Sequence, residues 1–97
     1  MVKLVVANPM AQSTVHKIPP AKRLGGLTGK TIGLYWNIKA GGDMALDEVE
    51  RLLERNYPEV NTVRIIGSIG STVRHLTPGD TEKIAASCDA VVGTTGD

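Results

Sequence analysis

The sequence predicts an α/β fold in which helices cover a parallel sheet. Two apolar segments typical of strands, Lys30–Trp36 and Val60–Ile66, are separated by one amphipathic helical segment, and a second helical segment leads to a third short strand. Strands that alternate with helices form parallel sheets with right-handed crossovers. The chain has no Phe, one Trp and two Tyr, and such an aliphatic core suits a parallel sheet buried on both faces.

Residues 1–29 are expected to form an extended arm outside the globular body. Lys3–Ala7 is a candidate short strand that Asn8-Pro9 closes, because proline cannot donate to a ladder. Residues 10–29 have no helical period and are interrupted by Pro19-Pro20 and by glycines. We therefore predict an arm over residues 1–29 and an α/β domain over residues 30–97.

The first half of the body is predicted to be a strand, a loop and a helix. The strand Lys30–Trp36 is mostly apolar and is bounded by turn residues. Asp43 is the expected N-cap of a helix over Met44–Asn56, because its carboxylate can accept from an orphan amide of the first turn. Asp47 and Arg51 have the i, i+4 spacing of an ion pair on that helix.

The second half of the body repeats the pattern. A strand is expected over Val60–Ile66, followed by a polar loop. Thr77 and Asp80 have the spacing of a capping box, which starts a helix over Pro78–Ser87 with proline at its first position. A strand over Ala90–Val92 is the last element.

These elements indicate a Rossmann-like, three-layer β-α-β-α-β order, which is half of a doubly wound domain. A sheet of three strands leaves apolar edges open. We therefore expect self-association into a homodimer or a larger oligomer.

Charge is distributed unevenly along the chain. The formal net charge of +1 argues against a nucleic-acid binder. All ten acidic residues lie from Asp43 onward, whereas the first 42 residues carry six basic residues. Three interpretations are open: the basic arm is solvated, it lies against the acidic body of the same or a partner subunit, or it lines an anion site.

Several classes of site have no support in the sequence. Cys88 is the only cysteine, so no intramolecular disulfide forms, and its position at the end of a helix predicts a core residue with an unactivated thiol. His16 and His75 lack metal-ligand spacing, and we predict neither a metal nor a cofactor. No apolar run approaches the roughly 18 residues of a membrane span, and the apolar start is too short for the apolar region of a signal peptide. We expect a cytoplasmic protein with no membrane contact.

Two loops follow predicted strands and carry the candidate site. Asn37–Asp43 has the position of a phosphate-binding loop but lacks G-x-G-x-x-G and G-K-[ST]. Its amides and Lys39 can hold a small anion, and an ordinary strand-to-helix turn is the alternative. Gly93–Asp97 can line a small-molecule site, with a frayed terminus as its alternative. The predicted binding residues are Asn37, Lys39, Asp43, Thr94, Thr95, Gly96 and Asp97.

Several short motifs together resemble the bacterial UGSC-motif selenoprotein family and its cysteine homologues. They are Leu27–Leu34, Asn37-x-Lys39-x-x-x-Asp43, Cys88–Val92 and Gly96-Asp97, and Asn8-Pro9 is similar to the family's N-terminal signature. In that family Gly-Asp is followed by selenocysteine or cysteine and then by Gly-Ser-Cys. Selenocysteine is encoded by a codon ordinarily read as stop, so the resemblance implies that this chain ends just before the reactive residue.

The resemblance implies a selenol- or thiol-dependent redox enzyme of unknown substrate. A selenolate or thiolate at a helix N-terminus is stabilised by the helix dipole, and a second cysteine three positions on can resolve an intermediate. As an amino-terminal fragment, the 97-residue chain alone is expected to be inactive. The alternatives are a module that binds a small anion and a self-associating structural domain without catalysis.

Overall fold

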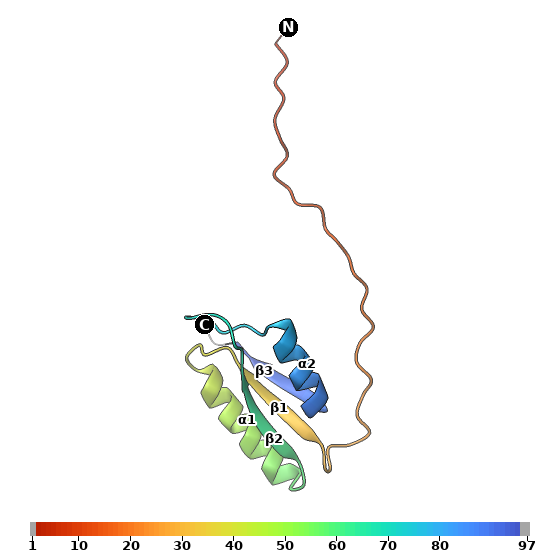
Figure 1. Cartoon of the computed structure of the whole chain (residues 1–97), viewed down its shortest axis with the longest axis vertical. Helices are drawn as coiled ribbons and strands as arrows, with labels where there is room; N and C mark the ends of the chain where they lie inside the picture. The colour runs from red at the N-terminus through yellow and green to blue at the C-terminus, as the bar shows by residue number, and fades with distance from the viewer. Residues whose placement is uncertain (1, 96–97) are drawn as a thin grey trace.

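A computed structural model of the chain describes residues 2–95 and consists of a small α/β body and a long arm (Figure 1). The body follows the order β-α-β-α-β, as predicted. Its elements are β1 (Thr31–Trp36), α1 (Gly42–Asn56), β2 (Asn61–Ile66), α2 (Pro78–Ser87) and β3 (Ala90–Thr94).

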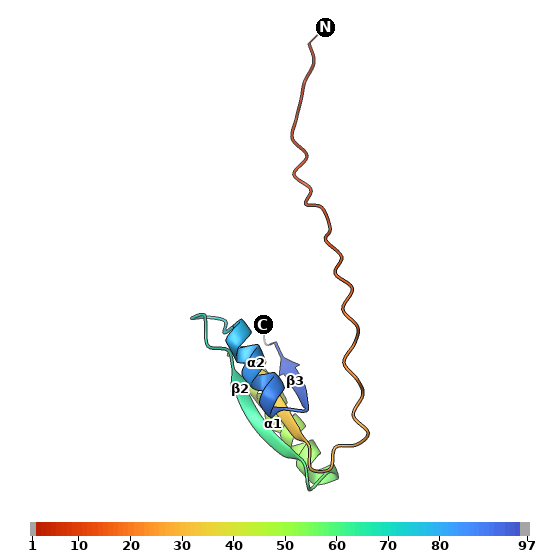
Figure 2. The same ribbon diagram turned by 45° about the vertical axis from the view of Figure 1, so that its right-hand side comes forward.

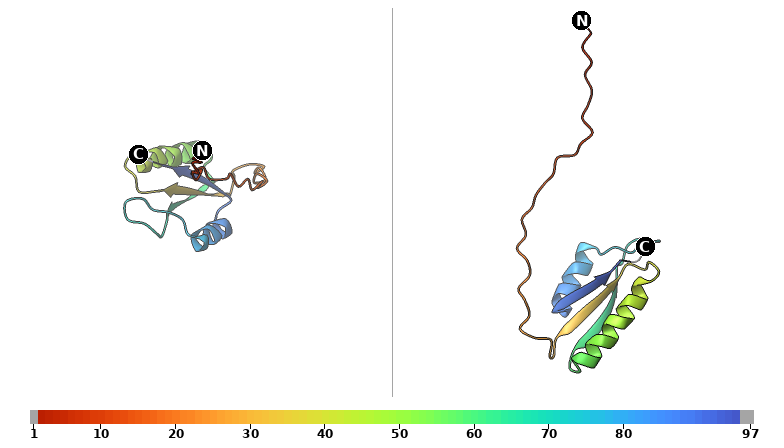
Figure 3. Two further views of the ribbon diagram at one scale, coloured as in Figure 1. Left: turned by 90° about the horizontal axis from the view of Figure 1, so that it is seen from above. Right: turned by 180° about the vertical axis from the view of Figure 1, so that it is seen from behind.

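The three strands form one parallel sheet in the order β2-β1-β3. Leu34 at the centre of β1 lies opposite Arg64 of β2 and Val92 of β3. The two helices lie on opposite faces of this sheet (Figure 3, left). The predicted α/β class and parallel sheet are thus confirmed.

The core lies between the sheet and α1. Leu34 and Leu46 are fully buried, and Ile32 and Val60 complete the buried cluster. Ile32 and Leu34 are alternate residues of β1, Leu46 lies on the apolar stripe of α1, and Val60 directly precedes β2. This spacing follows from a strand period of two and a helix period of 3.6. By contrast, α2 has no buried residue. The body therefore depends on α1 for most of its packing.

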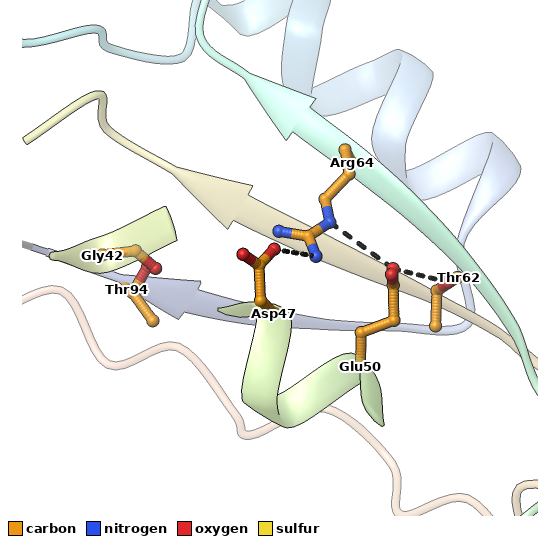
Figure 4. A network of polar contacts seen from close by, with 6 residues as sticks. All are labelled: Gly42, Asp47, Glu50, Thr62, Arg64 and Thr94. Atoms are coloured by element: carbon orange, nitrogen blue, oxygen red, sulfur yellow. Dashed lines mark hydrogen bonds and ion pairs between the residues drawn. The ribbon is translucent and has the colours of Figure 1, made fainter. Parts of the chain in front are cut away.

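Polar side chains bind α1 to the edge strand β2 (Figure 4). The guanidinium of Arg64 lies 2.7 Å from the carboxylate of Asp47 and 3.4 Å from that of Glu50. The hydroxyl of Thr62 donates to Glu50 over 2.9 Å. This bond and the nearby Arg64 hold the pKa of Glu50 below its ordinary value. The pairs are partly exposed, so each adds little stability.

The predicted strand over Lys3–Ala7 is wrong. These residues are extended but unpaired, and this end of the arm stays clear of the body in two views (Figures 1 and 2). A strand exists only where a neighbour satisfies its backbone groups, and no described segment pairs with this one. The absence of regular structure over residues 10–29 is as predicted.

Two details of α1 also differ from prediction. The N-cap is Gly41, in the left-handed region at φ 93°, and Asp43 lies within the first turn. Glycine adopts that conformation without the steric cost that a side chain adds, so the helix starts before Asp43 can cap it. Arg51 pairs with Glu48 rather than with Asp47, whose carboxylate reaches Arg64 across the sheet.

The second helix begins as predicted. Thr77 and Asp80 form a complete capping box, with Pro78 at the first helical position. The same Asp80 carboxylate accepts from the amide and the hydroxyl of Ser68. These hydrogen bonds, that from the Ser68 hydroxyl first, lower the pKa of Asp80 far below its ordinary range. The last strand runs two residues beyond the predicted Val92, because Gly93 and Thr94 pair with Tyr35 and Trp36.

Candidate functional site at the carboxyl edge of the sheet

The carboxyl ends of β1 and β3 meet the start of α1. The loop between β1 and α1 turns sharply through two residues in the left-handed region, Ile38 at φ 65° and Gly41 at φ 93°. The indole Nε1 of Trp36 donates to the carbonyl of Lys39 over 2.7 Å. The strand end therefore holds the loop in place.

Gly42 is the point where these segments make their closest contact. A Cβ atom built at Gly42 would lie 2.8 Å from Cδ1 of Trp36 and 3.0 Å from the hydroxyl oxygen of Thr94. That hydroxyl donates to the carbonyl of Gly42 over 2.9 Å, and Figure 4 shows the two residues facing one another. The end of β3 is thus bonded directly to the first turn of α1.

Asn37 is buried and holds the loop through hydrogen bonds of its side chain and its backbone. Only 8% of its surface is exposed, and its side-chain oxygen accepts from the amide of Lys39 over 3.2 Å. Its carbonyl accepts from the amide of Arg74, which belongs to the loop after β2. Tyr35 donates its hydroxyl proton to the carbonyl of Arg74 over 2.8 Å. The loops that follow β1 and β2 are therefore joined at this edge.

The predicted site residues fall into three groups. Asn37, Lys39 and Asp43 lie along the loop and the first helical turn, and Thr94 contacts that turn through Gly42. Thr95 is exposed immediately beyond β3. Gly96 and Asp97 lie outside the described residues.

The electrostatic potential at the start of α1 is positive. The amides of Asp43 and Met44 have no backbone acceptor within residues 2–95, as expected for the first turn of a helix. These amides and the helix dipole favour a negative charge nearby. Lys39 adds a positive side chain, whereas the Asp43 carboxylate already lies in the turn and repels a second anion. The edge therefore suits a single negative charge better than a doubly charged one.

Cys88 lies at the opposite edge of the sheet. It is the C-cap of α2 and directly precedes β3, whose first residue pairs with Ile32 near the start of β1. Its sulfur packs over Gly33, 3.1 Å from a Cβ built there. The thiol therefore belongs to the packing between α2 and the sheet, and it has no part in the carboxyl edge.

Three residues of this edge were missed by the sequence reading: Trp36, Gly42 and Arg74. Trp36 was assigned to a strand, but its indole bond to the loop depends on the turn geometry. The guanidinium of Arg74 donates to the carbonyls of Gly67 and Gly70, each over 2.8 Å. An arginine in a loop that contains two glycines is the only sequence signal for such bonds.

Comparison with known families decides the relationship of this chain. The family model described as the UGSC family matches residues 5–97. The chain belongs to the UGSC family. No curated protein and no solved structure matches it. The match runs through most of the arm as well as through the body.

Within residues 2–95, no helix combines the length and the apolar character needed to cross a membrane. The same residues contain no cluster of three or more His, Cys, Asp or Glu side chains arranged to hold a metal ion.

Proposed function

We propose that this chain supplies the amino-terminal half of the site of a selenol- or thiol-dependent redox enzyme. In this proposal the reactive selenocysteine or cysteine follows Gly96-Asp97 in the complete protein, as the motif of the family resemblance implies. One observation supports it above the others: the hydroxyl of Thr94 donates to the carbonyl of Gly42 over 2.9 Å. The end of β3 therefore lies beside the first turn of α1.

The chemistry of that turn fits a chalcogenolate. A thiol or selenol beside a helix N-terminus has a lowered pKa, because the amides and the dipole stabilise its anion. Lys39 strengthens this effect and Asp43 opposes it. With a disulfide as the electrophile, the anion would attack one sulfur, break the S–S bond and release the other sulfur as a thiol. The cysteine three positions on would then attack the mixed bond and release the second thiol, which leaves the substrate reduced and the enzyme pair oxidised to an internal bridge. A reducing compartment such as the cytoplasm, which keeps thiols free, belongs to the same proposal.

The proposal also defines what the 97-residue chain does alone. Cys88 is the only sulfur nucleophile of the sequence, and it lies at the other edge of the sheet. The chain by itself is therefore proposed to be an inactive scaffold. We further propose that β2-β1-β3 is half of a doubly wound, Rossmann-like sheet, because its helices already cover both faces (Figure 3).

Binding of a small anion by the Asn37–Asp43 loop is the second candidate. It is favoured by Lys39 and by the amides of Asp43 and Met44, which have no backbone acceptor within residues 2–95. The Asp43 carboxylate counts against a dianion such as phosphate. A titration with a monoanion such as nitrate, followed by the amide chemical shifts of Gly41 and Gly42, tests this second function: saturable shifts support it, and unchanged shifts count against it.

The redox proposal is tested on a protein extended past Asp97 along its natural reading frame, with cysteine in the reactive position. We expect that frame to continue into Gly-Ser-Cys and the first new cysteine to react with iodoacetamide faster than Cys88. Peptide mapping by mass spectrometry identifies the modified residue, and a Cys88→Ala variant serves as the control. A frame without Gly-Ser-Cys, or an extended protein that iodoacetamide leaves unmodified, would refute the proposal.

A further inference from the structure

We propose that residues 3–7 of the arm add as a strand to the open edge of β2 in a second copy of this chain. The two copies would exchange arms and form a closed dimer. This interface lies along the side of the sheet, away from the carboxyl edge, and does not depend on the redox proposal.

The donated segment is built like a strand but lacks a partner. Lys3–Ala7 is dominated by Leu and Val, and its branched side chains favour the extended state. Leu4, Val5 and Val6 are between 76% and 86% exposed. Such a run of exposed apolar residues is costly in water and marks a segment that pairs with another surface. Asn8-Pro9 would end the added strand, since proline cannot extend a ladder.

The receiving surface is the outer side of β2. In the order β2-β1-β3, this strand pairs only with β1 among the described residues, so every second amide and carbonyl along it points outward. Val63 and Ile66 on this strand are 44% and 52% exposed. An added strand would satisfy the backbone groups and cover both side chains, as in other cases of β-strand addition.

The other sheet edge is less available. The arm itself passes the start of β3, where residues 21–24 and residues 89–91 line a cleft of about 410 Å³. The arm of the same chain therefore lies nearer to β3 than to β2, and β2 is the edge farther from it (Figures 1 and 3).

Charge favours the same pairing. Residues 1–29 carry four basic residues and no acidic one, whereas residues 30–97 carry ten acidic and seven basic residues. The arm and the body thus have net charges of +4 and −3. The three ion pairs within the described residues all lie inside the body. Opposite charges would draw the arm of one copy toward the body of another.

The alternation of side chains along residues 3–7 would place the lysine of this segment near carboxylates of the body. If Leu4 and Val6 point to the face that carries Val63, then Lys3 points to the opposite face. That opposite face is the side of α1, where Asp47 and Glu50 reach over β2 toward Arg64 (Figure 4). A lysine at this position would add a cation to a cluster of two carboxylates and one guanidinium.

The occupant is a second copy because the arm runs away from its own body. The molecule measures 77 Å along its longest axis and 31 Å and 24 Å across, and the arm accounts for the length (Figures 1 and 2). Pro19-Pro20 stiffens the middle of the arm, since proline restricts the chain to extended conformations. Mutual exchange of the arms satisfies both open edges by one two-fold axis.

The first test is the mass of the full 97-residue chain in solution, measured by sedimentation velocity from about 1 to about 500 µM. We expect a dimer that dissociates on dilution, and that weakens as salt rises from about 50 to about 500 mM because the arm is basic. Val5→Pro should weaken the dimer about tenfold or more, by removing a ladder hydrogen bond. The matched control is Val15→Pro, an equally exposed arm position outside the added strand, which should leave the dimer unchanged.

The second test identifies the two partners. One copy carries Val6→Cys and the other carries Val63→Cys, both in a Cys88→Ala background, and the two are mixed and oxidised. We expect a disulfide between the different copies. A chain that carries both substitutions is oxidised in parallel. A monomer at every concentration, a dimer that Val5→Pro leaves intact, or a disulfide that forms within the doubly substituted chain but not between the mixed copies would each overturn the proposal. The second result would indicate direct β2-to-β2 pairing, and the third would indicate that the arm folds back on its own sheet.

Discussion

Gly42 links the two strand ends of the candidate site to the helix that follows. Its missing side chain lets the indole of Trp36 and the hydroxyl of Thr94 approach the first turn of α1 together. A side chain at this position would separate the end of β3 from the helix. The close junction on which the redox proposal depends therefore requires glycine.

Substitution of Gly42 by alanine tests this requirement. The new Cβ would lie 2.8 Å from Trp36, so we expect Gly42→Ala to lower the free energy of unfolding by about 1–3 kcal/mol, as in other overpacked sites. Urea denaturation followed by Trp36 fluorescence measures the change. In the matched control Gly79→Ala, the nearest atom to the new Cβ is 3.8 Å away, and alanine should stabilise the helix by up to about 1 kcal/mol. Equal stability of the two variants would contradict the role of Gly42.

At the scale of elements, the two helices are held in different ways. The apolar stripe of α1 is packed on the sheet around Leu46, whereas α2 buries no residue and begins with a complete capping box. The Asp80 carboxylate joins that box to Ser68. Capping and local hydrogen bonds should therefore contribute a larger share of the stability of α2 than of α1.

The lowered pKa of Asp80 makes this contribution depend on pH. Because the pKa is lower in the folded state than in the unfolded state, folding favours the charged carboxylate. The stabilisation is fully present above the ordinary aspartate pKa of about 3.9 and is lost as pH falls from there toward the lowered value. Asp80→Asn should thus destabilise the protein at neutral pH, and the difference from the wild type should shrink below about pH 4.

Urea unfolding followed by circular dichroism at several pH values measures the effect of Asp80→Asn. Glu82→Gln removes a carboxylate from the same helix at an exposed position that forms no hydrogen bond within the described residues, and it serves as the control. A difference between Asp80→Asn and the wild type that stays constant down to pH 2 would contradict the assigned role of the carboxylate.

An element could be predicted where the residues that determine it are close together in the sequence, and could not where contacts between distant segments determine it. The bounds of α2 follow from Thr77, Pro78 and Asp80, which act within one turn. The start of α1 was misplaced because Gly41 and Asp43 are both acceptable cap residues, and the left-handed turn of the loop decides between them. The partner of Arg64 depends on how β2 is aligned under α1, which no local pattern specifies.

At the scale of the whole molecule, the arm and the body carry opposite net charge and complementary unpaired surfaces. The strand predicted over Lys3–Ala7 has the right composition but no neighbour within the described chain. A prediction from composition states only that a segment can form a strand; pairing depends on what lies beside it. Arm exchange between two copies, as proposed above, would reconcile the sequence with the structure.

The candidate site was predictable in position but not in detail. Parallel strands place their carboxyl ends at one edge, so the loops after β1 and β3 were expected to carry the site. The contacts of Trp36, Gly42 and Arg74 that shape the edge arise only in the folded chain.

The most direct measurement of the central claim is the pH dependence of iodoacetamide alkylation at the first motif cysteine of the extended protein. If that cysteine lies beside the first turn of α1, the midpoint should fall below about 8.5, the value of an ordinary cysteine. It should return toward that value when urea unfolds the protein. A folded-state midpoint at or above the ordinary value would contradict the assignment of the carboxyl edge as the site of a reactive selenol or thiol.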